Sequence, residues 1–224
     1  MRIPLSKRLA RCADYIGVTN RVADIGCDHG YLGISLLKNG QAQSVIAADI
    51  RPMPLQAAKE NAERFGFQKK MEFFLSDGAQ KIPRDFDVMV CAGMGADTII
   101  SILENAPWLK STSYRLILQC QSKTAMLRKY LNEVGFSIQR ESALKDGRFL
   151  YTVMEVVYEQ DAPFTPGQCH FSPALAKEHT EETIAYYHQV IARLERAVAG
   201  QKETADPSLV EALRELKEIS YDIC

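Results

Sequence analysis

Residues 22–32, Val-Ala-Asp-Ile-Gly-Cys-Asp-His-Gly-Tyr-Leu, constrain the fold more than any other stretch of the chain. An apolar run passes into a turn with two glycines and then into a helical pattern, which predicts a buried strand, a tight turn and a helix. Gly26 and Gly30 allow the backbone to approach a ligand that a Cβ atom would exclude, and the helix start offers unpaired N–H groups. This junction is typical of nucleotide-binding α/β sheets, but a plain tight turn has the same pattern.

The segments that follow alternate between strand and helix patterns. A helix over 31–38 and an apolar strand over 44–49 complete a strand–helix–strand unit with two parallel strands. The alternation continues with a helix over 53–65, strands over 71–76 and 86–92, a helix over 98–105, a strand over 115–119 and a helix over 123–134. We therefore expect an α/β fold built on a mostly parallel sheet.

Four of these strands end in residues compatible with a ligand: Gly26, Asp49, Asp77-Gly78 and Gly93-Met94-Gly95. The carboxyl ends of parallel strands lie at one edge of the sheet, where the crevice is the expected binding site. The offset of Asp49 from Gly26 suits a carboxylate that accepts hydrogen bonds from ribose hydroxyls. A helix-capping or loop aspartate is the plainer alternative.

The sheet is expected to end in an antiparallel hairpin. Two alternating runs, 136–144 and 149–158, are joined by Lys-Asp-Gly-Arg, and Asp-Gly between such runs is a hairpin signal. A seven-stranded, mostly parallel sheet with a C-terminal antiparallel hairpin matches the Rossmann-like class I methyltransferases that use S-adenosylmethionine. The same hairpin weakens the alternative of an NAD-dependent oxidoreductase.

Six blocks of sequence carry a family resemblance, at residues 5–9, 23–32, 77–78, 92–95, 116–119 and 146–149. With them, residues 1–158 resemble the bacterial tRNA (adenine-22-N1)-methyltransferases. The chain departs from the family pattern at Ala96, where a glycine is usual, and at Cys120, where a proline is usual. The resemblance implies S-adenosylmethionine as cofactor, tRNA as substrate, no metal, and methyl transfer to N1 of an adenine. Since N1 needs no deprotonation before it attacks, positioning can supply most of the rate.

The resemblance also implies the site. The expected cofactor-binding residues are Asp24, Gly26, Asp28, Gly30, Asp49, Ile50, Asp77, Gly78, Gly93 and Met94. His29 and Tyr31, on the turn and the first helical residue, are the catalytic candidates, and a neutral His29 or a backbone carbonyl near Gly93 could accept a proton or stabilise positive charge. In the alternative, His29 caps the helix or bonds to Asp28, and Tyr31 belongs to the core.

The N-terminal segment is basic. An amphipathic helix over residues 5–16 is predicted, and the chain reaches no acid before Asp14. Four positive side chains form a candidate RNA-phosphate patch, Arg2, Lys7, Arg8 and Arg11. An ordinary solvated helix face is the alternative.

The charge shifts along the chain, from net +4 over residues 1–160 to net −5 over 161–224. We therefore expect a methyltransferase domain over 1–160 and a C-terminal helical hairpin over 161–224. A continuous helical pattern runs from Leu175 to Val198, and Asp206-Pro207 opens a second helix. This hairpin resembles a small coiled coil, and it either packs on the sheet domain or helps to read RNA.

Cysteine spacing and hydropathy limit the remaining classes. The six cysteines show no C-x-x-C spacing, which favours buried thiols over metal or disulfide chemistry. The sequence contains no 18-residue apolar run and no signal-peptide pattern, so we expect a cytoplasmic protein without a membrane span, with a monomer favoured. A non-catalytic module that binds S-adenosylmethionine or a partner remains the alternative to the enzyme.

Overall fold

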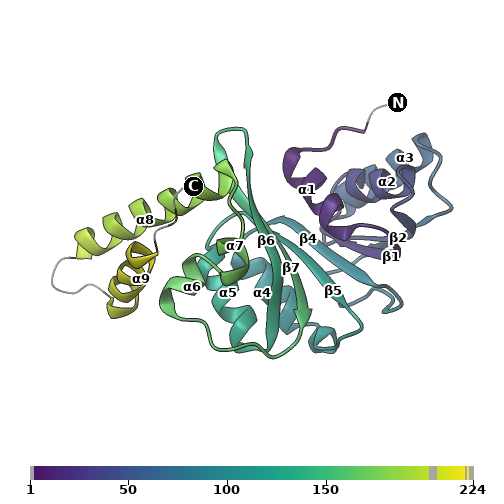
Figure 1. Cartoon of the computed structure of the whole chain (residues 1–224). Helices are drawn as coiled ribbons and strands as arrows, with labels where there is room; N and C mark the ends of the chain where they lie inside the picture. Colours follow the sequence, from purple (N-terminus) through teal and green to yellow (C-terminus); the bar gives the residue numbers. More distant parts are fainter. Residues whose placement is uncertain (1–2, 202–205, 220, 222–224) are drawn as a thin grey trace.

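A seven-stranded sheet in the order β3-β2-β1-β4-β5-β7-β6 forms the centre of the molecule (Figure 1). The computed structural model describes residues 3–201, 206–219 and 221. The strands are β1 (Thr19–Ile25), β2 (Ala42–Asp49), β3 (Met71–Leu75), β4 (Val88–Met94), β5 (Arg115–Cys120), β6 (Phe136–Asp146) and β7 (Phe149–Tyr158). The first five are parallel, and β7 pairs antiparallel with both β5 and β6. The expected α/β fold is confirmed.

Helices cover both faces of this sheet. They are α1 (Lys7–Ile16), α2 (Tyr31–Lys38), α3 (Pro52–Arg64), α4 (Ala96–Glu104), the short 3-10 helix η1 (Pro107–Leu109) and α5 (Thr124–Glu133). Successive strand residues belong to different apolar clusters: Val22 packs with α1, α2 and α3, and Ala23 packs with α4 and α5. Because side chains alternate across a strand, the two clusters lie on opposite faces of the sheet.

The β6–β7 hairpin extends past the end of its neighbour. Cys120, the last residue of β5, pairs with Thr152, and β7 continues through three more residues that pair only with β6. Three extended residues span about 10 Å. The tip of the hairpin therefore projects beyond the edge of the sheet formed by the carboxyl ends of the parallel strands, as the raised loop between β6 and β7 in Figure 1 shows.

The C-terminal helices form a third cluster beside the hairpin. They are α6 (Pro166–His170), α7 (Pro173–Ala176), α8 (Glu181–Gln201) and α9 (Pro207–Glu218). Figure 1 shows α8 and α9 side by side at one end of the molecule, and the hydroxyl of Tyr187 on α8 donates to the carbonyl of Leu216 on α9 at 2.6 Å. Ala143 and Leu150 of the β6–β7 hairpin pack into the same cluster. A domain division at residue 160 stays a prediction.

One expectation for this region is wrong in detail. The continuous helical pattern from Leu175 is interrupted, because α7 ends at Ala176 and α8 begins only at Glu181. Thr180 explains the restart, since its Oγ1 accepts a hydrogen bond from the N–H of Thr183 at 3.2 Å, the contact of an N-cap. The start of α9 is as expected, with Asp206 capping the N–H of Ser208 at 2.9 Å.

The cysteines are free thiols in the described part of the chain. Cys12, Cys27, Cys91 and Cys120 are buried and Cys169 is half-buried, whereas Cys224 lies outside the described residues. Burial raises the pKa of the Cys12 thiol to about 12. The prediction of buried thiols is confirmed for these four positions. Among the described helices, none combines the length and the hydropathy that crossing a membrane requires.

Candidate functional site

A cavity of about 740 Å³ opens where the parallel strands end. Each of the five parallel strands contributes residues to the cavity, either from the strand itself or from the turn that follows it. The start of α1 and one face of α4 complete the wall. The predicted strand-end residues do meet there. The cavity is lined by Asp24, Gly26, Asp28, His29, Tyr31, Asp49, Ile50, Asp77, Gly78, Gly93 and Met94.

Gly30 is the predicted cofactor residue that does not line the cavity. Its φ is +71°, and a Cβ atom there would lie 3.0 Å from Cβ of Ala58 on α3. Gly30 therefore allows α2 to begin close against α3, which is a packing role. Gly26 is different, because a Cβ atom on it would overlap Cε of the cavity residue Met94.

Asp24 is buried at the end of β1, and its Oδ2 has no hydrogen-bond partner among the described residues. Burial, and then the nearby Asp49, raise the pKa of this carboxyl to about 7, against a smaller lowering by a backbone hydrogen bond from Gly33. An unpaired buried carboxylate is costly, so this group favours a cationic partner in the cavity.

Asp49, the last residue of β2, is held in place by two backbone N–H groups. Its Oδ2 accepts from the N–H of Asp28 at 3.2 Å, and its Oδ1 accepts from the N–H of Arg51 at 2.9 Å. The side chain is 5% exposed. The Arg51 contact is the loop role foreseen as the alternative, but the carboxylate also lines the cavity, and its remaining lone pairs can accept from a ligand.

The end of β4 is shaped by a buried glutamine. Gly93 has φ +79° at an irregularity in the pairing of β4 with β5, and its N–H donates to Oε1 of Gln119 at 3.0 Å. Gln119 is fully buried, and its own Nε2 donates to the carbonyl of Cys120 at 3.1 Å. Sequence reasoning did not select Gln119 as a site residue. The available signal was its place as a polar residue at the end of an otherwise apolar fifth strand.

The residues of the predicted phosphate patch have separate environments. Arg8 lines the cavity, and its Nε is 2.9 Å from Oδ2 of Asp146 at the hairpin tip. Arg11 donates to Oγ of Ser142 at 2.9 Å and does not line the cavity. Lys7 is exposed. Arg2 lies outside the described residues.

The two catalytic candidates lie together at the cavity rim. The rings of His29 and Tyr31 are stacked with centroids 5.9 Å apart. Nε2 of His29 is 3.9 Å from Oδ2 of Asp28, which is an ion-pair distance rather than a hydrogen bond. The carbonyl of His29 accepts from Asn61 of α3 at 2.9 Å, which fixes the backbone of this turn. Tyr31 is half-buried and lines the cavity, so it is not a core residue.

One face of α4 forms a wall that was not predicted from the sequence. Thr98, Ser101 and Ile102 line the cavity, and Asp97 is paired with Lys123 at 2.8 Å. The hydrogen bond from Lys123 lowers the pKa of Asp97. This helix follows the glycine turn of β4 directly, which was the available signal.

The two departures from the family pattern cause no visible distortion. Ala96 is the first residue of α4 and has a negative φ, and its N–H donates to the carbonyl of Ser122 at 3.1 Å. Cys120 is buried at the end of β5 and does not line the cavity. In the described ranges, no three His, Cys, Asp or Glu side chains are grouped so that they could hold a metal ion.

Comparisons with known proteins agree with this geometry. A family model described as "Methyltransferase domain" matches residues 5–154. The chain is 31% identical over 164 residues to the tRNA (adenine(22)-N(1))-methyltransferase of Bacillus subtilis, covering 72% of this chain and 69% of that protein.

Solved structures are similar over nearly the whole chain. The B. subtilis M1A22 tRNA methyltransferase TrmK is 27% identical with a TM-score of 0.81, covering 97% of this chain and 96% of that one. Streptococcus pneumoniae Sp1610 in complex with S-adenosyl-L-methionine is 30% identical with a TM-score of 0.84, covering 96% of this chain and 99% of that one.

Proposed function

The chain belongs to the family of the bacterial tRNA (adenine(22)-N(1))-methyltransferases, and from this membership we propose that it methylates N1 of an adenine in tRNA with S-adenosylmethionine as methyl donor. By the same similarity, the proposed target is the adenine at position 22. The observation that carries the proposal is the cavity at the strand ends, which combines an unpaired buried carboxylate with a second, backbone-held carboxylate. A tRNA substrate also implies a cytoplasmic enzyme.

The residues present fit the cofactor. When bound, S-adenosylmethionine supplies a methyl group activated by a positively charged sulfur. Asp24 can pair with a cationic group of such a ligand, which satisfies its otherwise unpaired Oδ2. Asp49 can accept from two ribose hydroxyls. Gly26, which has no Cβ, accommodates Cε of Met94, whose side chain also lines the cavity. Ile50, exposed at the cavity edge, offers an apolar contact for a flat base.

The adenine-facing side of the cavity is assigned to the end of β4 and to the start of α2. Gly93 and Met94 are the last two residues of β4, and His29 and Tyr31 lie on the turn before α2 and at its first residue. Because N1 carries a lone pair, these residues need to orient the base rather than remove a proton before attack. Positive charge develops on the ring during transfer, and the Asp28 carboxylate, the imidazole of His29 and the carbonyl of Gly93 are acceptors that can stabilise it.

A direct assay tests the proposal. Wild-type protein is incubated with S-adenosylmethionine labelled in the methyl group and with unmodified tRNA, and the digested RNA is analysed for 1-methyladenosine. We expect label in that nucleoside, and none when the transcript carries guanine in place of the target adenine. Cofactor binding without transfer to any unmodified tRNA would contradict the proposal and support the alternative of a non-catalytic module.

A substitution at the rim tests the catalytic candidates. His29→Ala should lower kcat while leaving cofactor affinity within about twofold, because His29 is exposed and its backbone carbonyl keeps the Asn61 contact. His179→Ala, on the loop before α8, is a control at another exposed histidine. Equal activity of the two variants would show that the His29 side chain has no catalytic role.

A further inference from the structure

The tip of the β6–β7 hairpin is exposed and lies beside the cavity rather than away from it. Phe149, the first residue of β7, is 52% exposed, so its ring is open to a partner. It pairs with Asp146, and Asp146 forms the 2.9 Å ion pair with Arg8, a residue of the cavity wall. One ion pair therefore joins the tip to the proposed active site.

Two neighbouring aromatic rings lie between two guanidinium groups, one at the tip and one at the cavity. The guanidinium of Arg148 lies 4.9 Å from the centroid of the Phe149 ring, and the Phe149 and Tyr151 rings are 6.2 Å apart. The guanidinium of Arg8 lies 4.9 Å from the Tyr151 ring. Because Phe149 and Tyr151 are two residues apart on one strand, they share a face. Four side chains therefore form a continuous series of contacts from the tip to the cavity: Arg148, Phe149, Tyr151 and Arg8.

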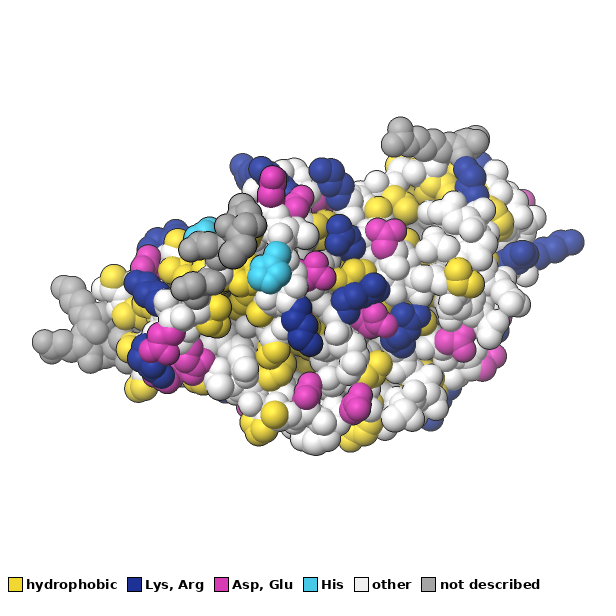
Figure 2. Space-filling model, in the orientation of Figure 1, with side chains coloured by type: hydrophobic (Ala, Val, Ile, Leu, Met, Phe, Trp, Pro, Cys, Tyr) yellow, Lys and Arg dark blue, Asp and Glu magenta, His cyan; other side chains and the backbone are white. Residues whose placement is uncertain are grey.

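The tip carries net positive charge. Lys145 and Arg148 are exposed, and the charge of Asp146 is compensated by Arg8. Figure 2 shows Lys and Arg side chains at the top of the molecule, over the hairpin of Figure 1, with acidic side chains beside them. An exposed ring flanked by cations suits an unpaired nucleotide, whose base stacks on the ring while its phosphates contact the cations. A neutral protein surface or an acidic peptide would use only part of this arrangement.

The proposed reaction creates a need for such an element. N1 lies on the Watson–Crick edge of adenine, so the base must leave its stack before it can enter a cavity at the sheet edge. Unstacking exposes the face of the neighbouring nucleotide, and covering that face offsets part of the cost. We propose that Phe149 stacks on the nucleotide next to the target adenine while Arg148 contacts its backbone. Lys145 pairs with Leu150, so it lies on the other face of the hairpin and adds only to the local positive charge. This inference rests on the proposed function and assigns a substrate-positioning surface to the hairpin.

The first test uses three variants of Phe149 in the full chain. Phe149→Ala and Phe149→Leu should lower kcat/KM for unmodified tRNA by about 10- to 100-fold, the range of one lost base–aromatic stack. Phe149→Trp should retain activity, because it keeps an aromatic face. Affinity for S-adenosylmethionine and the thermal midpoint should stay unchanged in all three. Val18→Ala is the control, since Val18 is 84% exposed and precedes β1. It therefore lies at the amino ends of the parallel strands, whereas the cavity lies at their carboxyl ends.

A second test asks whether the partner of Phe149 is a base. Transcripts are made with an abasic site on either side of the target adenine. On the transcript that lacks the stacked base, wild type and Phe149→Ala should be equally slow, because neither can form the contact. On the intact transcript they should differ.

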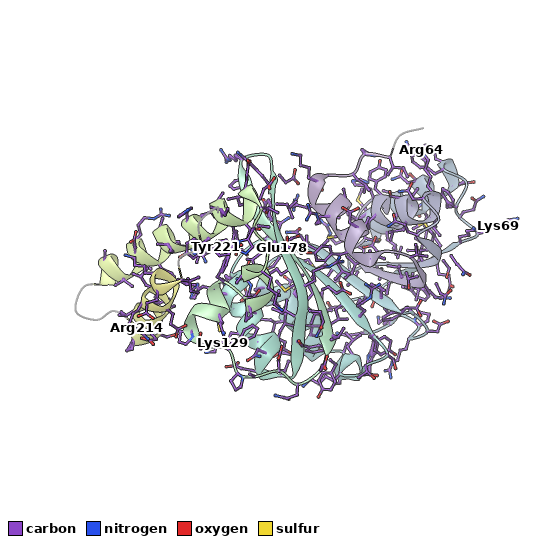
Figure 3. All side chains as sticks on the ribbon, in the orientation of Figure 1. Arg64, Lys69, Lys129, Glu178, Arg214 and Tyr221 are labelled. Atoms are coloured by element: carbon purple, nitrogen blue, oxygen red, sulfur yellow. The ribbon has the colours of Figure 1, made fainter. Side chains whose placement is uncertain are left out.

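A charge variant with a matched control completes the set. Arg148→Gln should weaken tRNA binding and lower the dependence of log affinity on log salt by about one. Arg64 has the same local arrangement, with its guanidinium 5.1 Å from the ring of the next residue, Phe65. Figure 3 labels Arg64 at the end of the molecule remote from the hairpin, so Arg64→Gln should change neither quantity.

The outcomes separate the inference from the proposed function. Wild-type protein that methylates no tRNA overturns both. Wild-type activity combined with full activity of Phe149→Ala, or with full activity of Phe149→Leu, overturns the stacking inference alone. Loss of cofactor affinity in Phe149→Ala also overturns it, since the side chain would then act on the cofactor site.

Discussion

Arg128 and Glu141 form an ion pair in which neither side chain is exposed to solvent, with Nη2 of Arg128 at 2.7 Å from Oε1 of Glu141. Burial alone would lower the pKa of Arg128, but the carboxylate of Glu141 outweighs it and the pKa is raised, so Arg128 stays charged. Arg128 also donates to the carbonyl of His170 at 2.7 Å, and Glu141 accepts from Ser172 at 2.6 Å. The pair thus joins α5 and β6 to the end of α6 and the start of α7, the first two C-terminal helices.

Replacing Arg128 by methionine should strongly destabilise the protein. The change leaves Glu141 buried without a counter-charge, and removing one partner of a buried pair costs about 3–5 kcal/mol of the free energy of unfolding. Urea denaturation of the variant measures this loss.

Two variants make that prediction specific. Arg128→Met combined with Glu141→Leu should recover most of the stability, because no unpaired charge remains. Arg214→Met removes an exposed arginine of α9, labelled in Figure 3, that pairs with Glu211 at 2.6 Å, and it should change stability far less. A loss in Arg214→Met as large as that in Arg128→Met would show that burial is not the cause.

The sheet and the cavity could be predicted from the sequence because both follow from local patterns. Apolar runs of strand length predict the strands, and the residues after them must meet at one edge if the strands are parallel. Asp49 and Gly93 were found in this way. Element ends were less predictable, because contacts between distant segments extend them. β1 begins at Thr19 rather than Val22, since Thr19 and Arg21 pair with Ala42 and Ser44 of β2.

Contacts made only in three dimensions explain the rest. Nothing near Arg128 in the sequence distinguishes it from a solvated arginine of an amphipathic helix, and its partner is on another element. Gln119 likewise acquires its role from Gly93, which lies on the neighbouring strand. The basic patch was grouped by proximity in sequence, yet Arg8 and Arg11 point to different partners on the hairpin.

Asp49→Ala should weaken the binding of S-adenosylmethionine by about 10- to 100-fold, the loss expected for one or two hydrogen bonds to a charged group. The backbone N–H groups of Asp28 and Arg51 would also lose their acceptor. Titration calorimetry measures the affinity. Asp85→Ala, an exposed carboxylate paired with Arg21 at 3.4 Å, is the control and should bind normally. Unchanged affinity of Asp49→Ala would show that the ribose assignment is wrong.

Gln119→Leu should lower kcat more than it lowers cofactor affinity. The variant keeps a similar volume but removes the acceptor for the N–H of Gly93, and an unsatisfied buried donor costs about 1–3 kcal/mol. The end of β4 that faces the adenine would lose its fixed geometry, with an expected loss of about tenfold or more in single-turnover rate. Gln139→Leu, at an exposed glutamine of β6, is the control. Equal rates in wild type and Gln119→Leu would show that Gln119 is not needed to position the residues that face the adenine.

Lys7→Glu should weaken tRNA binding and reduce its salt dependence, because Lys7 is the exposed member of the basic N-terminal set in the described chain. A lost phosphate contact changes the slope of log affinity against log salt by about one. Lys69→Glu, labelled in Figure 3 beyond α3 and far from the hairpin, carries the same charge change and should have a smaller effect. If both variants behave alike, net charge rather than a contact explains the loss.

The raised pKa of Asp24 predicts opposite effects of pH on stability and on cofactor binding. In the unfolded chain this carboxyl titrates near 3.8, whereas in the folded protein without ligand its pKa is about 7. Between these values the folded state holds a proton that the unfolded state has lost. The stability that Asp24 contributes is therefore present at low pH and is lost as pH rises through about 7. A cationic ligand requires the ionised carboxylate, so affinity for S-adenosylmethionine should rise over the same range and level off above it.

Asp24→Asn cannot ionise, and it should bind more weakly with a flat pH profile between pH 5.5 and 8, a range set by the pKa of about 7. Denaturation and calorimetry at several pH values measure the two effects. A wild-type affinity profile parallel to that of Asp24→Asn would mean that Asp24 does not pair with the ligand cation.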